Sequence, residues 1–292
     1  MTPTAAEKRF AWLLCAPAVT AMLVVTGWPV AYAIWLSLFR YDLRFPGQRA
    51  FVGLDNYLSV FTSEVWWQAF GNTLLLTVVS VGIELVVGLA LALLMHRTVF
   101  GRRTVRTVIL IPYGIITVVA ALAWKFAFDP TTGFVNALLG LDQAWLTDRP
   151  SALFVIIFTE VWKTAPFMAL LLLAGLTLVP EDVLQAARVD GASAWQRLWR
   201  ITLPLMKPTI LVALLFRTLD AFRIFDTVFV QTRGAHGTES VSLVGYHTLV
   251  TRLNLGLGSA VSVLIFACVV VIAVLFVKAF GTALQTGVDD AR

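Results

Sequence analysis

The chain reads PEDVLQAARVDGASAWQRLWRITLP from Pro180 to Pro204, a polar stretch between two long apolar segments. Pro180 marks a helix start, because proline fits the first helical position. Glu181 and Asp182 follow it, and acidic side chains favour the positive end of the helix dipole. Gly191 can adopt the left-handed conformation that ends a helix. The stretch therefore predicts a helix that begins near Pro180 and ends at a tight turn.

A second short helix is predicted after this turn. Ser193 and Gln196 are three residues apart, which is the spacing of a capping box. One apolar face of the helix would hold three side chains, Trp195, Leu198 and Trp199. Pro204 is expected to end the helix. Two ordered helices over about residues 181–203 predict a docking surface for a partner; the alternative is an amphipathic pair that rests on lipid.

The composition is that of an integral membrane protein. Of the 292 residues, 59% are hydrophobic and 13% are charged, whereas a soluble domain carries about 25% charged residues. Six segments are long and apolar enough to span a bilayer: Ala11–Leu38, Ala69–Met95, Thr104–Phe126, Ser151–Val179, Leu205–Val230 and Ser259–Phe280. We therefore expect an all-α polytopic membrane protein with six transmembrane helices in a single domain over residues 1–292.

The placement of Lys and Arg predicts the orientation. With the N-terminus inside, the cytoplasmic segments hold most of the lysines and arginines that lie outside the spans. The positive-inside rule then places both termini and residues 181–203 in the cytoplasm. The net charge of +5 reflects this topology. Basic residues are scattered over several loops rather than gathered on one face, so no nucleic-acid partner is expected.

The sequence lacks the motifs of nucleotide and metal chemistry. No G-x-x-x-x-G-K-[ST] loop occurs, so if ATP drives this protein, another polypeptide hydrolyses it. The two cysteines and three histidines show neither CxxC nor HxxxH spacing, and no metal site is expected. We expect no cofactor bound by this chain and no catalytic residues.

Residues 185–204 resemble the "EAA" coupling loop of ABC-importer permeases, which reads Glu-Ala-Ala, three residues, Gly, and later apolar-x-Leu-Pro. The positions that match are Ala186, Ala187, Asp190, Gly191, Ala192, Ile201, Leu203 and Pro204. Gln185 departs from the family's Glu, which contacts the ATPase subunit; an amide keeps hydrogen bonding but loses the charge. The resemblance implies an ATPase-coupling set of Gln185, Ala186, Ala187, Arg188, Asp190, Gly191, Trp195 and Trp199.

Further stretches are similar to the MalF/UgpA branch of carbohydrate ABC permeases. They are residues 51–57 (FVGLDNY), Asn72-Thr73, Ile83-Glu84-Leu85, residues 128–136 and residues 225–232. The resemblance extends from about residue 8 to 285 and implies the type I importer permease fold. Within the branch, the chain is most similar to mycobacterial trehalose permeases, which implies ATP-driven import of a di- or oligosaccharide, with trehalose the expected sugar.

The family also implies a complex in the bacterial plasma membrane, surrounded by lipid. Its members are a second homologous permease, two ATPase subunits that bind ATP and Mg and dock on the coupling helices, and an extracytoplasmic sugar-binding protein. The external segment from Thr232 to Leu257 is polar and rich in glycine. We interpret it as a gating loop that contacts the binding protein.

Charged residues inside the spans point to the transport path. Each costs about 2.5–3.5 kcal/mol at mid-bilayer, so it should face protein or water. The fifth span has four, at intervals of three: Arg217, Asp220, Arg223 and Asp226. Each step of three turns a helix by about 300°, so on one continuous helix the charges wind around it. Such a helix would place Arg217, Asp220 and Ile224 on one face.

Two interpretations of these charges remain open. By resemblance to the maltose member, sugar contacts come from Lys163, Thr164, Phe167, Arg217, Asp220, Ala221 and Ile224. Alternatively, the charges form ion pairs between helices, the role expected for Glu84, Glu160, Arg223 and Asp226. Glu160 and Lys163 are also spaced as an i, i+3 pair.

A secondary transporter is the alternative function. It would use the carboxylates Glu84, Glu160, Asp220 and Asp226 as a proton relay. That class often shows inverted repeats and broken helix pairs. No such repeat is evident in the sequence, and the coupling loop would have no role.

Overall fold

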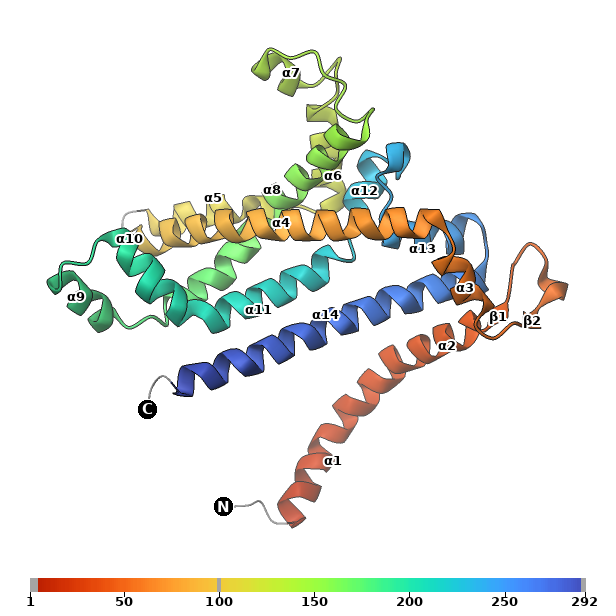
Figure 1. Cartoon of the computed structure of the whole chain (residues 1–292), viewed down its shortest axis with the longest axis horizontal. Helices are drawn as coiled ribbons and strands as arrows, with labels where there is room; N and C mark the ends of the chain where they lie inside the picture. Colours follow the sequence, from red (N-terminus) through yellow and green to blue (C-terminus); the bar gives the residue numbers. More distant parts are fainter. Residues whose placement is uncertain (1–4, 99–100, 290–292) are drawn as a thin grey trace. The chain divides into compact units, whose positions relative to one another are not determined.

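The computed structural model describes residues 5–98 and 101–289, and most of them are helical (Figure 1). They form two compact units. One comprises Met1–Trp66 and Val244–Ala267, and the other comprises Trp67–Leu243 and Cys268–Arg292. Within the described residues, five helices are long and apolar enough to cross a membrane, or six if a bent pair counts as one span.

The smaller unit begins with a nearly continuous helical run, formed by α1 (Ala5–Met22), a π-helical turn η1 (Leu23–Gly27) and α2 (Trp28–Ser37). A hairpin of β1 (Phe39–Arg40) and β2 (Ala50–Phe51) follows, with the 3₁₀ turn η2 (Pro46–Gln48) in its loop. Helix α3 (Asp55–Phe61) and the π turn η5 (His247–Thr251) complete this unit with the first part of α14 (Leu255–Asp289).

The hairpin is fixed by aromatic and amide contacts. The guanidinium of Arg49 lies over the rings of Trp35, Phe39 and Tyr41, 4.7–5.0 Å from their centroids. Such cation–π contacts hold a charged side chain against apolar surface. The Asn56 side chain also donates to the carbonyl oxygens of Ser37 and Phe39, at 2.7 and 2.9 Å.

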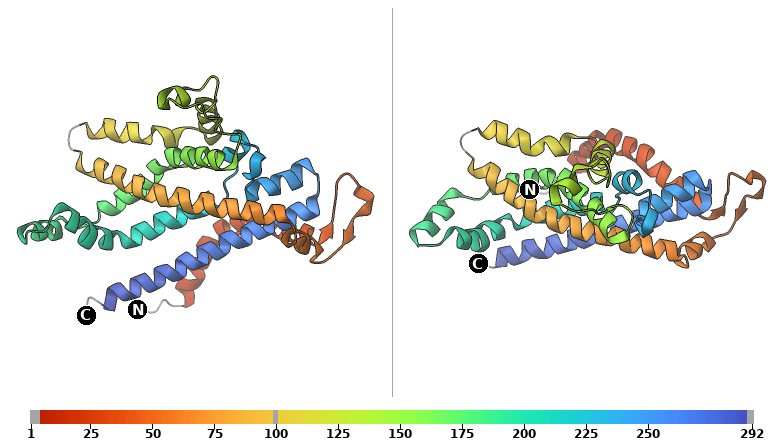
Figure 2. Two further views of the ribbon diagram at one scale, coloured as in Figure 1. Left: turned by 45° about the horizontal axis from the view of Figure 1, so that its top comes forward. Right: turned by 90° about the horizontal axis from the view of Figure 1, so that it is seen from above.

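The larger unit contains α4 (Glu64–Arg97), most of which belongs to it, and the helices that pack around α8 (Arg149–Leu176). Helix α8 contacts α5 (Arg102–Gly114), α6 (Thr117–Ala127), α11 (Leu203–Ala221) and α12 (Asp226–Gln231) (Figures 1 and 2). The short elements are α7 (Phe134–Leu139), α9 (Glu181–Val189), α10 (Ala194–Arg197), the π turn η3 (Leu198–Thr202), the 3₁₀ turn η4 (Ala235–Gly237) and the start of α13 (Val241–Tyr246).

The apolar core of the larger unit lies where α4, α8 and α11 meet. Its buried side chains include Met95, Met168, Leu172 and Met206. Small residues allow the helices to approach closely. A Cβ on Gly175 of α8 would lie 2.7 Å from Cγ2 of Thr209 on α11. Close packing of small residues is a common way for membrane helices to associate, because lipid supplies no hydrophobic force between them.

The third predicted span is bent. Helices α5 and α6 meet at 89° across Ile115 and Ile116. Ile115 has extended dihedral angles, and Pro112 lies within the last turn of α5. The last residue of α5 is Gly114, a poor helix former, so the sequence contained a signal for this bend.

The expectation of one continuous helix through the fifth span is wrong. Helix α11 ends at Ala221, and α12 begins at Asp226. The last turn tightens, because the amides of Arg223 and Ile224 bond to carbonyl oxygens only three residues earlier. The freed carbonyl of Ile224 accepts a hydrogen bond from the hydroxyl of Ser240 at 2.9 Å. A side chain outside the helix therefore satisfies one of the carbonyl groups that the break leaves free.

The expectation that Pro204 ends a helix is also wrong. The chain passes from α10 through η3 into α11 with helical dihedral angles at Leu198 and Leu203. The amide of Leu203 bonds to the carbonyl of Leu198, five residues back. Pro204 follows this π turn directly within one helical run, so the proline does not end the helix here.

We predict that Gly175→Ala destabilises the protein by about 1–3 kcal/mol, because the new methyl group would overlap Thr209 and force α8 and α11 apart. The free energy of unfolding in mixed detergent micelles measures this. Gly82→Ala is the matched control: its Cβ meets no atom within 4 Å on α4, so stability should be unchanged or slightly raised. Equal stability of the two variants would contradict close packing at Gly175.

Candidate functional site

A polar cavity of about 270 Å³ lies in the larger unit, at the break between α11 and α12. Its walls come from the α5–α6 bend, from the middle of α8, and from both sides of the break. The lining residues are Tyr113, Thr117, Glu160, Lys163, Thr164, Arg217, Asp220, Arg223, Ile224, Phe225, Asp226 and Thr227. Six of these twelve carry a formal charge, which marks the cavity as a site for a polar ligand rather than for lipid.

A buried arginine organises one wall of the cavity. The Arg217 side chain is only 1% exposed. Its Nε donates to Glu84 Oε2 at 2.5 Å, and its Nη2 donates to Glu84 Oε1 at 2.9 Å and to Glu160 Oε2 at 3.1 Å. Its Nη1 donates to Asp220 Oδ2 at 2.6 Å. One guanidinium on α11 therefore joins carboxylates from α4, α8 and its own helix.

Two threonines complete the network. The hydroxyl of Thr164 lies 2.7 Å from Glu84 Oε1, and that of Thr227 donates to Glu160 Oε1. Because Thr227 belongs to α12, Glu160 bonds to both sides of the break in the fifth span. Hydrogen bonds of this kind are needed because a buried carboxylate without partners costs several kcal/mol.

Four charged side chains that line the cavity are unbound or only partly bound by the Arg217 network: Lys163, Asp220, Arg223 and Asp226. Asp220 is 68% exposed, and only its Oδ2 has a partner in the described part of the chain. The ammonium of Lys163 lies 5.5 Å from the ring centroid of Tyr113. Arg223 and Asp226 also line the cavity. Over the described residues, no ion pair or side-chain hydrogen bond joins Arg223 or Asp226 to another group.

Aromatic rings form part of the cavity wall. Tyr113 stacks on Phe167 with 5.2 Å between centroids and an interplanar angle of 18°. Tyr113 lines the cavity, and Phe167 lies behind it. A stacked pair of this kind is a rigid apolar plate, and a sugar presents its C–H face to such a surface.

The seven predicted path residues fall into three groups: those that line the cavity, one that lies behind its wall, and one in the apolar core. Lys163, Thr164, Arg217, Asp220 and Ile224 line the cavity. Phe167 contacts it only through Tyr113, and Ala221 belongs to the apolar core instead. The predicted helix face shared with Ile224 does not exist, because α11 ends at Ala221 and Ile224 lies in the following turn.

Of the four residues expected to form ion pairs, two are paired in the structure and two are not. Glu84 and Glu160 pair with Arg217. Arg223 and Asp226 do not pair in the described structure, because the break removes the i, i+3 geometry that the sequence spacing implied. Nor does Lys163 pair with Glu160, which bonds to Arg217 and Thr227 instead. Sequence reasoning did not assign Tyr113, Thr117, Phe225 and Thr227 to the site. Phe225 and Thr227 lie in residues 225–232, one of the stretches that resemble the family, and Pro112 lies beside Tyr113.

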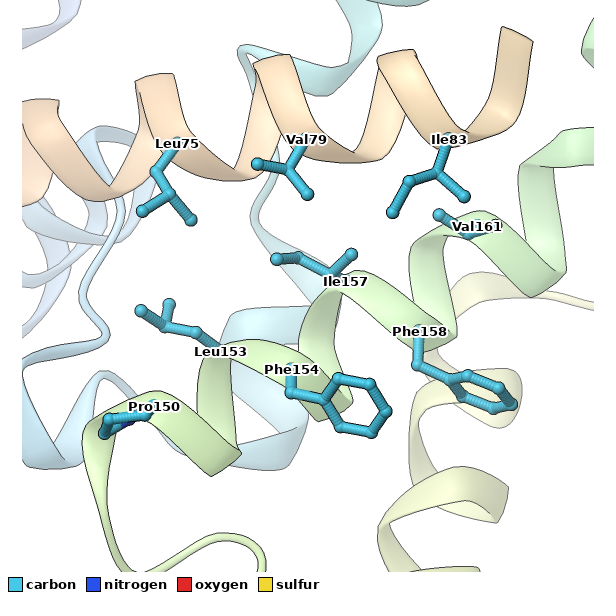
Figure 3. Close-up of a pocket in the computed structure, with 9 residues that line it drawn as sticks. All are labelled: Leu75, Val79, Ile83, Pro150, Leu153, Phe154, Ile157, Phe158 and Val161. Carbon is cyan, nitrogen blue, oxygen red and sulfur yellow. The ribbon is translucent and has the colours of Figure 1, made fainter. Parts of the chain in front are cut away.

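A second cavity has the opposite character. It has a volume of about 360 Å³ and lies between α4 and α8 (Figure 3). Leu75, Val79 and Ile83 point into it from α4, and the side chains opposite them belong to α8: Pro150, Leu153, Phe154, Ile157, Phe158 and Val161. All nine lining residues are apolar, so this groove offers no hydrogen bond to a sugar.

The predicted coupling segment forms two short helices joined by a turn. Helix α9 ends at Val189, and Gly191 has a φ of +80°, in the left-handed region. Ser193 and Gln196 form the predicted capping box, with Ser193 N donating to Gln196 Oε1 at 2.7 Å. Arg197 also donates to the carbonyl of Ala192 and closes the turn.

Most of the expected coupling side chains are exposed. They are Gln185, Ala186, Arg188, Asp190, Trp195 and Trp199, while Ala187 is buried. The two indole rings lie 5.5 Å apart and line an apolar cavity of about 410 Å³ with Leu85, Leu89 and Leu172. Gln185 and Arg188 line a different, polar cavity with His96, Arg97 and Arg197. The segment therefore has one apolar face toward α4 and α8 and one polar face.

A bundle of apolar helices around a charged cavity, with an exposed helix pair after the fourth span, defines a membrane permease. Residues 84–290 match the family model of the binding-protein-dependent transport system inner membrane component. This match spans more than half of the chain, and the chain belongs to that family. It is therefore the permease subunit of an ABC importer, a transport subunit rather than an enzyme, and in such importers separate subunits hydrolyse ATP.

Similar proteins agree with this family. The chain is 56% identical, over 98% of its length and 94% of the relative, to the trehalose transport system permease protein SugA of Mycobacterium tuberculosis. It is 39% identical to the trehalose/maltose transport system permease protein MalF of Thermococcus litoralis, with 93% and 94% of the chains covered. A chain in the crystal structure of a bacterial alginate ABC transporter has a similar fold, with a TM-score of 0.79 at 24% identity, covering 93% of both chains.

These findings confirm the predicted family and the type I importer permease fold. They favour the importer over the alternative of a secondary transporter. The structure agrees, because three of the four carboxylates considered for a proton relay, Glu84, Glu160 and Asp220, are bound to one arginine.

We predict that Arg217→Met destabilises the protein by about 3–5 kcal/mol, because it leaves Glu84 and Glu160 buried without a countercharge. Arg223→Met is the matched control: this arginine is exposed and unpaired in the described structure, so the cost should stay below about 0.5 kcal/mol. Unfolding in mixed micelles measures both. A mild effect of Arg217→Met would show that the network contributes little to stability.

Proposed function

We propose that this permease transports a neutral disaccharide, trehalose, through the polar cavity at the break between α11 and α12. The observation that carries the proposal is the cavity's set of partly free charges of both signs: Lys163 and Arg223 against Asp220 and Asp226. The two relatives whose names include trehalose support the choice of sugar.

The chemistry of the cavity suits a ligand with many hydroxyl groups. Lys163 and Arg223 donate to hydroxyl oxygens, and Asp220 and Asp226 accept from hydroxyl hydrogens, in charge-assisted hydrogen bonds. The charges of these four groups cancel, so a neutral sugar adds no net charge to the site. Tyr113, backed by Phe167, supplies the apolar surface for the sugar's C–H face.

The permease works in a complex, of which this chain is one part. We infer a second homologous permease, two ATPase subunits that carry ATP and Mg, and an extracytoplasmic sugar-binding protein. Both termini face the cytoplasm of a bacterial cell, in agreement with the distribution of Lys and Arg. Helices α9 and α10 then face the ATPase, and the proposed contact residues are Gln185, Ala186, Ala187, Arg188, Asp190, Gly191, Trp195 and Trp199.

We predict that Gly191→Pro abolishes sugar uptake while the protein still inserts into the membrane. Proline fixes φ near −65°, whereas the turn requires +80° at this position, so α10 would be turned away from the ATPase. Uptake of labelled trehalose in cells measures the effect, and membrane fractionation measures insertion.

Gly191→Asn is the matched control, because asparagine tolerates the left-handed conformation better than other side chains do. It should keep most of the uptake. Normal uptake by Gly191→Pro would contradict a docking role for this turn, and loss of uptake in both variants would show that bulk rather than backbone conformation matters there.

The proposed function as a whole is tested by purifying the complex and assaying its ATPase in lipid, with and without the binding protein loaded with trehalose. Stimulation by the loaded protein is the expected result. An assembled ATPase that responds to another sugar but not to trehalose would keep the importer and overturn the substrate. If no ATPase copurifies with this chain, the proposed partners are wrong.

A further inference from the structure

Glu84 belongs to the network around Arg217 rather than to the wall of the polar cavity. It is fully buried on α4 and does not line the cavity. Yet it makes two of the four hydrogen bonds of the Arg217 guanidinium, including the one at 2.5 Å. A carboxylate in the membrane interior that the ligand cannot reach must act, if at all, through its neighbour.

The geometry of the contact fixes the orientation of Arg217. The two oxygens of Glu84 accept from Nε and Nη2, which lie on the same edge of the planar guanidinium. A bidentate contact of this kind sets both the position and the plane of the group. The remaining nitrogen, Nη1, is then directed at Asp220 Oδ2, 2.6 Å away.

The orientation of the Asp220 carboxylate depends on the direction of Arg217 Nη1. It lies in the last turn of α11, two-thirds exposed, and within the described structure Nη1 of Arg217 is the one side-chain partner of its carboxylate. Without that contact, the carboxylate is free to rotate about its side-chain bonds. With it, Oδ2 is held and Oδ1 remains available to a ligand in the cavity.

We propose that Glu84 is a positioning residue of the sugar site, which orients Asp220 for the substrate through Arg217. This inference rests on the proposed function of the cavity as the sugar site. Glu160 also binds Arg217, but it lines the cavity and bonds to Thr227, so its substitution would change the site directly. Glu84 is therefore the residue whose effect must pass through the arginine.

A double-mutant cycle tests the proposal. The complete transporter is assembled in lipid nanodiscs with this chain as wild type, Glu84→Gln, Asp220→Asn or both. Binding of radiolabelled trehalose is measured by equilibrium dialysis in the absence of the binding protein. We expect each single variant to weaken binding about tenfold, the value of one charge-assisted hydrogen bond. The double variant should bind within about twofold of Asp220→Asn alone, because residues that act through one contact are not additive.

Other outcomes separate this inference from the proposed function. If Asp220→Asn leaves binding unchanged, the cavity is not the sugar site, and both proposals fail. If Asp220→Asn weakens binding but Glu84→Gln does not, the sugar site stands and the positioning role is overturned. A double variant weakened by the product of the two single effects also overturns it, because Glu84 would then act independently of Asp220.

Two further variants keep the test decisive. Glu64→Gln makes the same change at an exposed position of α4, and trehalose binding should equal that of the wild type. If Glu84→Gln does not assemble, Glu84→Asp replaces it in the cycle. Aspartate keeps the charge, but its side chain is shorter by one methylene and pulls the guanidinium away from Asp220, so weaker binding is again expected. Wild-type binding by Glu84→Asp would overturn the proposal.

Discussion

The cost of burying one guanidinium determines much of the larger unit. A charge with no partner inside a helical bundle is too expensive to keep, so Arg217 requires carboxylates at fixed places around it. Glu84 comes from α4, Glu160 from α8 and Asp220 from α11, and Glu160 reaches α12 through Thr227. Four helices are therefore bound to one another by polar contacts where membrane helices gain little from apolar burial.

The break in the fifth span determines what this network can do. On a continuous helix, the four charges of the fifth span would pair with one another as i, i+3 neighbours. Because α11 ends at Ala221, only the Arg217–Asp220 pair keeps that geometry. Arg223 and Asp226 line the cavity without forming a pair in the described structure. Because of the break, Arg223 and Asp226 are available as a donor and an acceptor instead of being bound in a row of ion pairs. The break also frees backbone carbonyl groups, one of which accepts a hydrogen bond from Ser240.

Local patterns predict the spans and the coupling turn, whereas tertiary contacts decide the cavity. The capping box of Ser193 and the left-handed turn at Gly191 depend on residues within a few positions of each other, so the sequence alone indicates them. The length and apolar composition of the spans likewise indicate a membrane protein. Glu84 and Arg217, by contrast, are 133 positions apart, and nothing in their spacing selects this pair over other intramembrane charges. The end of α11 has neither glycine nor proline to mark it, and its partner Ser240 lies outside the helix.

The continuity past Pro204 has a mechanical consequence. Pro204 and Pro208 lie inside this stretch and lack an N–H, yet the backbone from Ala194 to Ala221 is helical without a break. The π turn η3 is its only departure from regular α-helical geometry within this stretch. At about 1.5 Å per residue, this rod spans roughly 40 Å. One end carries Trp195 of the coupling segment, and the other carries Arg217 and Asp220. Under the proposed coupling, a displacement of α10 by the ATPase moves the arginine network directly, because no flexible loop lies between them to absorb it. The same proline that was expected to separate the coupling helix from the fifth span instead lies within the rod that joins them.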